Sequence, residues 1–148
     1  MSIKIFNEQD KIKLDIRKIR KYLPSIEKKM LLSKDDGYNI IFIDDREIKK
    51  LNKKFRKTNH PTDVLSFKNS HNKCSPPIYR GVKRSEADIF ISVETAKSNA
   101  KFYKQVFYIE ILRLIIHGML HSIGYTDYSK KAKKMMWEKQ EQVLKCIM

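Results

Sequence analysis

The sequence predicts an α/β or α+β domain, in which a small mixed sheet of about four strands is packed with about five helices. Three observations lead to this prediction. The hydrophobic class makes up 41% of the 148 residues, which is enough for one compact core. Short β-branched runs alternate with segments of helical periodicity. Pro and Gly number only 4 each, too few for a long linker, so we expect one domain over residues 1–148.

The first half of the chain is expected to supply two strands and two helices. Residues 3–5 alternate with polar neighbours, which predicts a short strand. Apolar residues then recur at helical spacing over 12–23, and we expect that helix to stop at Pro24. A compact β-branched and aromatic run at 38–43 predicts the second strand. Acidic residues follow it and can cap a helix whose apolar face spans 48–55.

Two further strands come next. Residues 64–67 predict a strand that is entered through Pro61, and residues 89–91 predict another. The polar loop between them contains two prolines and Gly81, and we expect it to be mobile.

Three helices are expected to complete the fold. The pattern is helical from after Ser92 to about Tyr103, and again over 106–123, where Gly124 breaks it. A last amphipathic helix is predicted from about Ser129. Its expected inner face is apolar and consists of Ala132, Met135, Met136, Val143 and Leu144.

The segment HGMLHSIGYTD, from His117 to Asp127, carries the most informative pattern. An HxxxH spacing puts two imidazoles one turn apart on one helix face, so His117 and His121 can both reach one ion. Gly124 then lets the chain reverse, and Asp127 can return as a third ligand. Two neutral imidazoles and a carboxylate suit zinc and leave a position for water. We therefore expect one catalytic zinc per chain, at the end of a central apolar helix.

Other interpretations of these ligands stay open. A bare HxxxH pair is more often two helix histidines without a metal. This pair, however, lies at the end of an apolar helix, where an unpaired imidazole would be costly, and that favours the metal. Asp127 could instead be a turn or capping residue. In that case His60 and His71 are the next candidates for the third ligand.

A second group of polar residues precedes and enters the strand at 64–67. Arg56 is expected at the end of its helix, where a guanidinium can grip a phosphate through two parallel hydrogen bonds. The alternative is an ordinary solvated charge. Thr62 and Asp63 are expected to cap or brace the loop before the strand, a structural role that we favour over a catalytic one.

Charge and cysteine content indicate the partners and the compartment. A formal net charge of +15 would attract a polyanion such as nucleic acid, unless Lys is merely abundant here. Cys74 and Cys146 form no ligand spacing, so we expect no disulfide partner and a cytoplasmic location. The N-terminus is charged where a signal peptide is apolar. The most apolar segment, 106–116, is interrupted by Glu110 and Arg113 and is too short to span a bilayer, so no membrane partner is expected.

Together these residues resemble the YbeY family of bacterial metal-dependent endoribonucleases, whose signature runs HGxLHLxGYDH with an upstream PTDVLSF segment. The resemblance spans most of the chain. The matching positions fall in the family's order and at similar spacing, and they are Asn52, Arg56, the PTDVLSF segment from Pro61 to Phe67, Asp88 with Ile89, Glu110 and the histidine segment.

The resemblance implies a sheet packed with helices, one zinc ion and cleavage of single-stranded RNA. It also implies a part in 16S ribosomal RNA 3′-end maturation and in ribosome quality control, with RNA and the ribosome or its small subunit as partners. By the same resemblance, His117 and His121 match the first two metal-binding histidines. Arg56 matches a functionally important arginine of the family.

The chain departs from the family pattern at three positions. The family's third histidine falls at Asp127, its preceding aspartate falls at Thr126, and the glycine expected before Asp88 is Ala87. A carboxylate is a legitimate zinc ligand, so metal binding is still expected, while the affinity and the preferred metal are open.

Two rival functions are kept. The spacing HxxxHxxGxxD also fits a zincin-like metalloprotease, but those enzymes carry a Glu base after the first histidine, where this chain has Gly118. The other rival is a ribosome-associated RNA-binding assembly factor with a structural metal. Such a site would need a fourth protein ligand, for which Cys74, His60 and His71 are the candidates.

Overall fold

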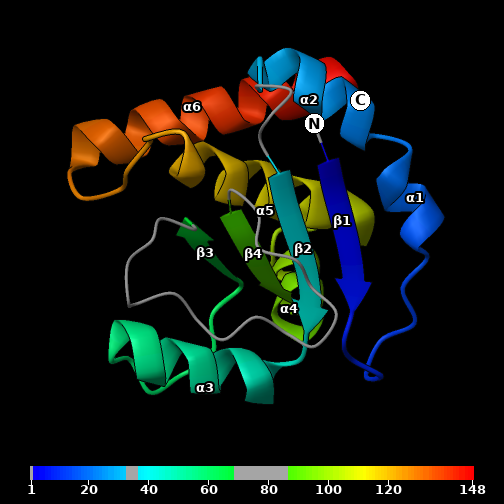
Figure 1. The fold of residues 1–148 in the computed structure, drawn as a ribbon, viewed down its shortest axis with the longest axis vertical. Coiled ribbons are helices and arrows are strands. Elements are labelled where there is room, and N and C mark those ends of the chain that lie inside the picture. Colours follow the sequence, from blue (N-terminus) through cyan, green and yellow to red (C-terminus); the bar gives the residue numbers. More distant parts are fainter. Residues whose placement is uncertain (1, 33–36, 69–86) are drawn as a thin grey trace.

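A computed structural model of the chain describes residues 2–32, 37–68 and 87–148. Over these residues it confirms the mixed α/β fold class, with four strands and six helices (Figure 1). In chain order they are β1 Ser2–Asn7, α1 Ile16–Arg20, α2 Leu23–Met30, β2 Gly37–Ile43, α3 Asp45–Arg56, β3 Val64–Lys68, β4 Ala87–Ser92, α4 Val93–Phe102, α5 Phe107–Ser122 and α6 Lys130–Ile147. The polar loop with Pro76, Pro77 and Gly81 lies outside the described residues.

The four strands form one mixed sheet in the order β1-β2-β4-β3. Strands β1, β2 and β4 run parallel, and β3 pairs antiparallel with β4 at the edge of the sheet. Figure 1 shows α3 at one end of the sheet, α6 and α2 across the other end, and α5 behind it. The edge strand β3 therefore lies between α3 and α5, and both helices contact it.

Alternating side chains of the strands feed two hydrophobic clusters, one on each face of the sheet. In β2, Ile40 and Phe42 join the large cluster, which includes the inner faces of α5 and α6. Their neighbours Ile41 and Ile43 join a small cluster that is covered by α3. Because both faces are covered, β2 is buried from Tyr38 to Ile43, as its continuous apolar run indicates.

The first helical region differs from its prediction. The single helix expected over 12–23 is replaced by α1 and α2, and Pro24 lies in the first turn of α2 instead of ending a helix. Proline is well tolerated there, because the first N–H groups of a helix have no partner within the helix. This second short helix explains why the described chain has six helices and not about five.

Helix α5 approaches the sheet closely through Gly118. A β-carbon at this position would meet Cγ2 of Ile89, in β4, at 2.7 Å, so a larger residue would require the Ile89 side chain or the helix to shift. The carbonyl of Gly118 also accepts a hydrogen bond from the Ser66 hydroxyl of β3 at 3.0 Å. Glycine thus fixes the distance between α5 and the strands in front of it.

Helix α6 begins where the sequence predicts, because the Ser129 side chain accepts from the N–H of Ala132. Met136, Val143 and Leu144 are buried as expected. Met135 is not, since 54% of it is exposed. None of the described helices is both long and apolar enough to cross a bilayer.

Candidate active site

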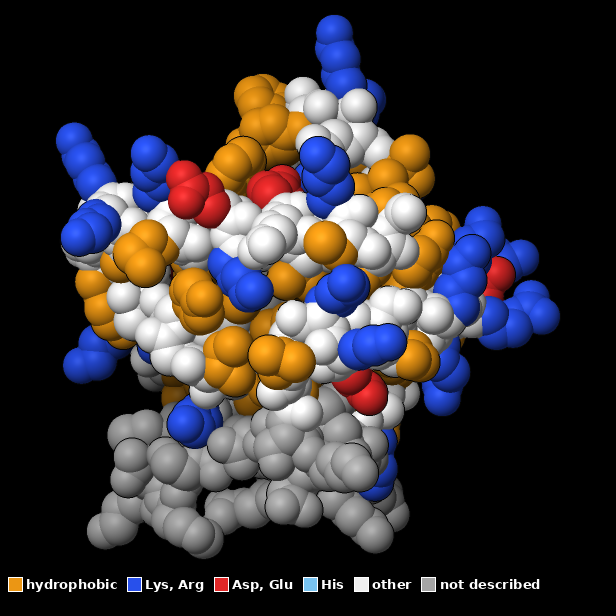
Figure 2. Space-filling model, turned by 90° about the horizontal axis from the view of Figure 1, so that it is seen from above, with side chains coloured by type: hydrophobic (Ala, Val, Ile, Leu, Met, Phe, Trp, Pro, Cys, Tyr) orange, Lys and Arg blue, Asp and Glu red, His pale blue; other side chains and the backbone are white. Residues whose placement is uncertain are grey.

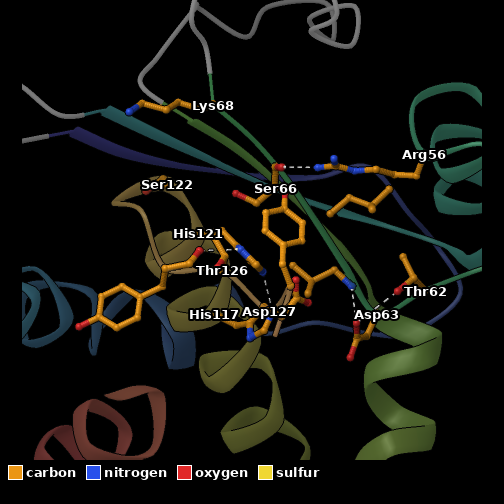
Figure 3. A pocket seen from close by; sticks show the side chains of 14 residues that line it. Arg56, Thr62, Asp63, Ser66, Lys68, His117, His121, Ser122, Thr126 and Asp127 are labelled. Carbon is orange, nitrogen blue, oxygen red and sulfur yellow. Dashed lines mark hydrogen bonds between the residues drawn. The ribbon is translucent and has the colours of Figure 1, made fainter. Parts of the chain in front are cut away.

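The two histidines of the HxxxH segment meet at the C-terminal end of α5. Their rings lie edge to face with centroids 4.7 Å apart, and the Nε2 atoms of His117 and His121 are separated by 3.1 Å. Both side chains are half-buried and line a hollow of about 580 Å³. We call it the histidine hollow. Figure 3 shows the pair together with Asp127, Ser66 and Arg56.

Hydrogen bonds at the other ring nitrogens fix how the two imidazoles are turned. Nδ1 of His121 lies 3.1 Å from the carbonyl oxygen of Tyr125, and Nδ1 of His117 lies 2.7 Å from Oε1 of Gln140. Because a carbonyl oxygen only accepts, each Nδ1 carries a hydrogen, and in a neutral ring Nε2 then carries the lone pair. Ligating histidines in proteins are oriented in the same way, by an acceptor on the nitrogen that does not bind the metal.

The spacing of the two Nε2 atoms fits a shared metal ion. The two Nε2 atoms lie 3.1 Å apart, which is also within hydrogen-bond distance. In a tetrahedral zinc site with Zn–N distances of about 2.05 Å, two ligand nitrogens are about 3.3 Å apart. The pair therefore suits zinc with little movement.

The electrostatics of the hollow favour the neutral form of His121. Burial lowers the pKa of His121 below its usual 6.5, and the neighbouring His117 lowers it further. Asp127 and the hydrogen bond to Tyr125 act in the opposite direction, and Arg56 contributes a small lowering. A neutral imidazole is the form that binds a metal.

Asp127 lies in the wall of the same hollow, on the turn between α5 and α6. Gly124 makes that turn with φ +109, a conformation that favours glycine. The side chain of Asp127 is exposed, and among the described residues no three His, Cys, Asp or Glu side chains stand together as a ready set of metal ligands. The structure thus brings the two histidines together and leaves Asp127 nearby.

Arg56 reaches the histidine hollow from the last turn of α3. Its guanidinium carbon lies 5.3 Å from the centroid of the Phe67 ring, and Nη2 donates to the carbonyl oxygen of Ser66 at 3.2 Å. In Figure 3 this side chain enters from α3, while the histidines come from α5. Arg56 and His117 therefore line the same hollow, although they are 61 residues apart in the sequence.

The loop before β3 has the structural role that the sequence predicts. Asp63 accepts from the N–H of Val64 at 2.8 Å and from Asn99 at 3.2 Å, which braces the loop against α4. Asn52, buried on α3, donates to the carbonyl oxygen of His60 at 2.9 Å. His60 itself is exposed and does not line the hollow. His71 and Cys74 lie outside the described residues.

The sequence analysis missed the residues that orient the histidines. Gln140 comes from α6, and no local pattern links it to His117, 23 residues earlier. Its signal is a polar residue that falls among the apolar positions of an amphipathic helix, since Gln140 is only 5% exposed. The carbonyl of Tyr125 gives no sequence signal at all.

Comparison with known proteins gives a consistent result. The family model described as Endoribonuclease YbeY matches residues 4–148. An Endoribonuclease YbeY of Endomicrobium trichonymphae is 40% identical over 109 residues, which cover 74% of this chain and 70% of that protein. Another from Syntrophus aciditrophicus is 33% identical over 147 residues, or 97% of this chain and 88% of that protein.

A solved structure agrees with these relatives. The solution structure of a Thermotoga maritima protein superimposes with a TM-score of 0.62 at 30% identity, covering 98% of this chain and 88% of that one. The family match over nearly the whole sequence therefore includes the histidine pair, Arg56 and the sheet that holds them. The chain belongs to the YbeY endoribonuclease family.

Proposed function

We propose that this chain is a zinc-dependent endoribonuclease that cleaves single-stranded RNA. One observation carries the proposal: two oriented imidazoles converge, with their Nε2 atoms 3.1 Å apart, in a hollow that also receives the guanidinium of Arg56. Nitrogen ligands and a cation beside them suit a phosphodiester substrate. The relatives that carry the name endoribonuclease support the same reaction class.

His117, His121 and Asp127 would hold the ion, one per chain. Zinc, when bound, supplies a Lewis acid that lowers the pKa of water or polarises a phosphoryl oxygen. Gln140 and the Tyr125 carbonyl keep the two Nε2 atoms aimed at one point, and this removes the cost of turning the rings when the ion arrives. Asp127 would be the third ligand, from the wall of the same hollow, where its side chain is exposed.

Arg56 would bind the phosphate whose ester bond is broken. Its bond to the Ser66 carbonyl uses one of five N–H donors, and its contact with Phe67 fixes the plane of the guanidinium. The remaining donors are available to phosphate oxygens, where negative charge gathers as the bond breaks.

The surface charge suits an RNA backbone. The chain has 32 Lys and Arg against 17 Asp and Glu. Figure 2 shows Lys and Arg side chains spread around the face formed by α2 and α6, with few acidic ones between them. Such a surface binds phosphates without reading sequence and releases counterions. Binding of single-stranded RNA should therefore weaken steeply as salt is added, and a flat dependence in binding isotherms would argue against RNA as the substrate.

The test of the activity combines metal analysis with RNA cleavage. Protein purified without chelator should contain about one zinc per chain and should cut a single-stranded RNA, and chelator should abolish the cleavage. His117→Ala and His121→Ala should lose both the zinc and the activity. Zinc that is retained in both variants would refute the metal site. Full zinc with no cleavage of any RNA would instead favour a structural metal in an RNA-binding assembly factor.

We extend the proposal to a cytoplasmic role in 16S ribosomal RNA 3′-end maturation and ribosome quality control, through binding to the ribosome or its small subunit. The support is membership of the family together with a strongly basic surface. Cells depleted of the protein should accumulate 16S RNA that is extended at its 3′ end. A normal 3′ end in depleted cells would limit the proposal to the chemical activity.

A further inference from the structure

A second hollow, of about 330 Å³, opens beside the histidine hollow. We call it the aromatic hollow. The two hollows share His117, Asp127, Asp63 and Val64 in their walls, so they meet at the proposed metal ligands. A polymer that passes through one of them would continue into the other.

Two exposed aromatic rings from different elements form the walls of the aromatic hollow. Tyr103, at the end of α4, is 63% exposed, and Trp137, on α6, is 58% exposed. The folding of the chain does not require such large rings at the surface. Aromatic faces beside an RNA-cleaving centre can stack on the bases of a single strand.

The face of α6 links the Trp137 ring directly to the metal ligands. Lys133, Trp137 and Gln140 follow each other at spacings of four and three, so they lie on one side of the helix. Gln140 bonds to Nδ1 of His117, as described above, and Trp137 lies one turn before it. Lys133 lies one turn further out, in the exposed first turn of α6. Along this side of α6, Lys133 is therefore farthest from His117, Trp137 comes next, and Gln140 contacts it.

The floor of the aromatic hollow does not suit a phosphate. Glu110 is 4% exposed and pairs with Arg113 at 2.8 Å, and Arg113 also binds Glu141 at 2.9 Å. The charge of Arg113 is therefore already neutralised. The Glu110–Arg113 pair leaves Asp63 and Asp127 with Lys133 as the remaining cation of this lining, whereas the histidine hollow sets the same two carboxylates against Arg56 and Lys68. Carboxylates accept hydrogen bonds from the N–H and amino groups of bases and repel phosphate.

We propose that the aromatic hollow binds a nucleobase of single-stranded RNA next to the bond that is cut, with the base stacked on Trp137. Lys133 would contact a neighbouring phosphate outside the hollow. The volume is near the lower end of small-ligand sites, about 300–1,000 Å³, which suits one base with its sugar. This inference rests on the proposed function, because it places part of the same substrate.

Trp137 provides its own probe, because it is the only tryptophan in the chain. Rapid mixing of the zinc-loaded protein with a short single-stranded oligoribonucleotide should quench its fluorescence before cleavage occurs. An abasic oligomer of the same length, which keeps the phosphates but has no rings to stack, should leave the fluorescence nearly unchanged. Equal quenching by both oligomers would overturn the proposal.

Variants separate stacking from other roles of the ring. Trp137→Ala should raise the KM for RNA about 5- to 150-fold, the loss expected for one stacked base, with kcat near the wild-type value. Trp137→Phe should restore most of the affinity. Met135→Ala removes another exposed apolar side chain of the same helix and should bind RNA like the wild type.

The outcomes distinguish this inference from the proposed function. A wild-type protein that never cleaves RNA refutes the endoribonuclease itself. A wild-type protein that cleaves RNA, with Trp137→Ala unchanged in KM and in affinity, refutes only the base site and assigns the exposed ring to another partner.

Discussion

The two hollows that meet at His117 share Asp63 and Asp127 but differ in the rest of their lining. The histidine hollow combines two imidazoles with Arg56 and Lys68, which suits a phosphate and the proposed metal ion. The aromatic hollow combines rings with carboxylates, which suits a base. The difference teaches that turnover and substrate affinity should be separable in this protein. Changes in the first hollow should alter zinc content or kcat, and changes in the second should alter KM.

The largest effect on turnover is expected at Arg56. Arg56→Ala should lower kcat by about 100- to 1,000-fold, the usual cost of removing one group that stabilises developing charge. Zinc content and folding should not change, since Arg56 binds no metal. Arg56→Lys should rescue only partly, because an ammonium lacks the planar two-pronged contact. Arg46→Ala, at the exposed start of the same helix, is the control and should remain active.

Steady-state kinetics with a labelled single-stranded RNA would measure these values. Normal turnover of Arg56→Ala would show that the arginine has no part in the reaction. Only the proposed metal ligands would then assign catalysis to the histidine hollow.

Substitutions of Asp127 test whether this residue supplies the third metal ligand of the histidine hollow. Asp127→Ala should weaken zinc binding by about 100-fold, the upper end of what even indirect partners of a ligand cause. Asp127→His should restore it, because imidazole is a good zinc ligand. A carboxylate gives the ion more negative charge than an imidazole does. The pH profile of Asp127→His should therefore lie at lower pH than that of the wild type.

Competition with a chromophoric chelator would give the zinc affinities of these variants. Thr126→Ala is the matched control and should bind like the wild type. Wild-type zinc affinity in Asp127→Ala would require a different third ligand, and His60 or His71 would be examined next.

Gln140 lines the aromatic hollow but bonds to His117 of the histidine hollow, and it therefore limits the contrast between them. It orients the His117 ring through Nδ1. Gln140→Leu should lower zinc affinity about 10- to 100-fold, as expected for the partner of a ligating histidine. Gln142→Leu makes the same change at an exposed position two residues later and should have no effect. Equal zinc affinity in both variants would show that the hydrogen bond does not orient the ligand.

Glu110 should affect stability and leave turnover largely unchanged. Burial raises its pKa above the usual 4.5, against the lowering by Arg113, and Asp63 and Glu141 raise it further. The folded state therefore holds this proton more tightly than the unfolded state does. The stabilisation is complete below about pH 4.5 and is lost as the pH rises through the raised pKa.

Urea unfolding of Glu110→Gln at a series of pH values would reveal this dependence. Relative to the variant, the wild type should lose stability as the pH increases above 4.5. Glu138→Gln, at an exposed position on α6, should show a constant difference from the wild type. A constant difference for Glu110→Gln as well would mean that its pKa is not raised.

Much of the fold could be predicted because its signals are local. The apolar run at 38–43, the acidic residues after it and the helical pattern from about Ser129 gave the correct element types, and the structure identifies Asp44 and Ser129 as the N-caps. The prediction that a helix stops at Pro24 was wrong, because a proline can either end a helix or lie in its first turn. Periodicity alone does not distinguish these cases. The prediction that Met135 is buried was also wrong. Met135, Met136 and Trp137 are consecutive apolar residues, and they cannot all face one side of a helix.

The site could be predicted only in part, for a different reason. His117 and His121 lie one turn apart on a single helix, so their spacing carries their geometry. Arg56, Gln140 and Trp137 come from other elements, and their distance from the histidines depends on how α3 and α6 pack. The sequence indicated Arg56 as a guanidinium at a helix end, and the resemblance to a family supported that choice. It offered no signal for the aromatic hollow.

The close contact at Gly118 separates this endoribonuclease family from zincin-like metalloproteases, which have a similar histidine spacing. A metalloprotease base would occupy this position, directly after the first histidine. Here that position faces the interior of the sheet, and even one added carbon would meet Ile89 at 2.7 Å. A glutamate at this position would fit only if the Ile89 side chain or the helix shifted. The packing of α5 on β4 therefore disfavours the general base that zincin-like proteases carry after the first histidine.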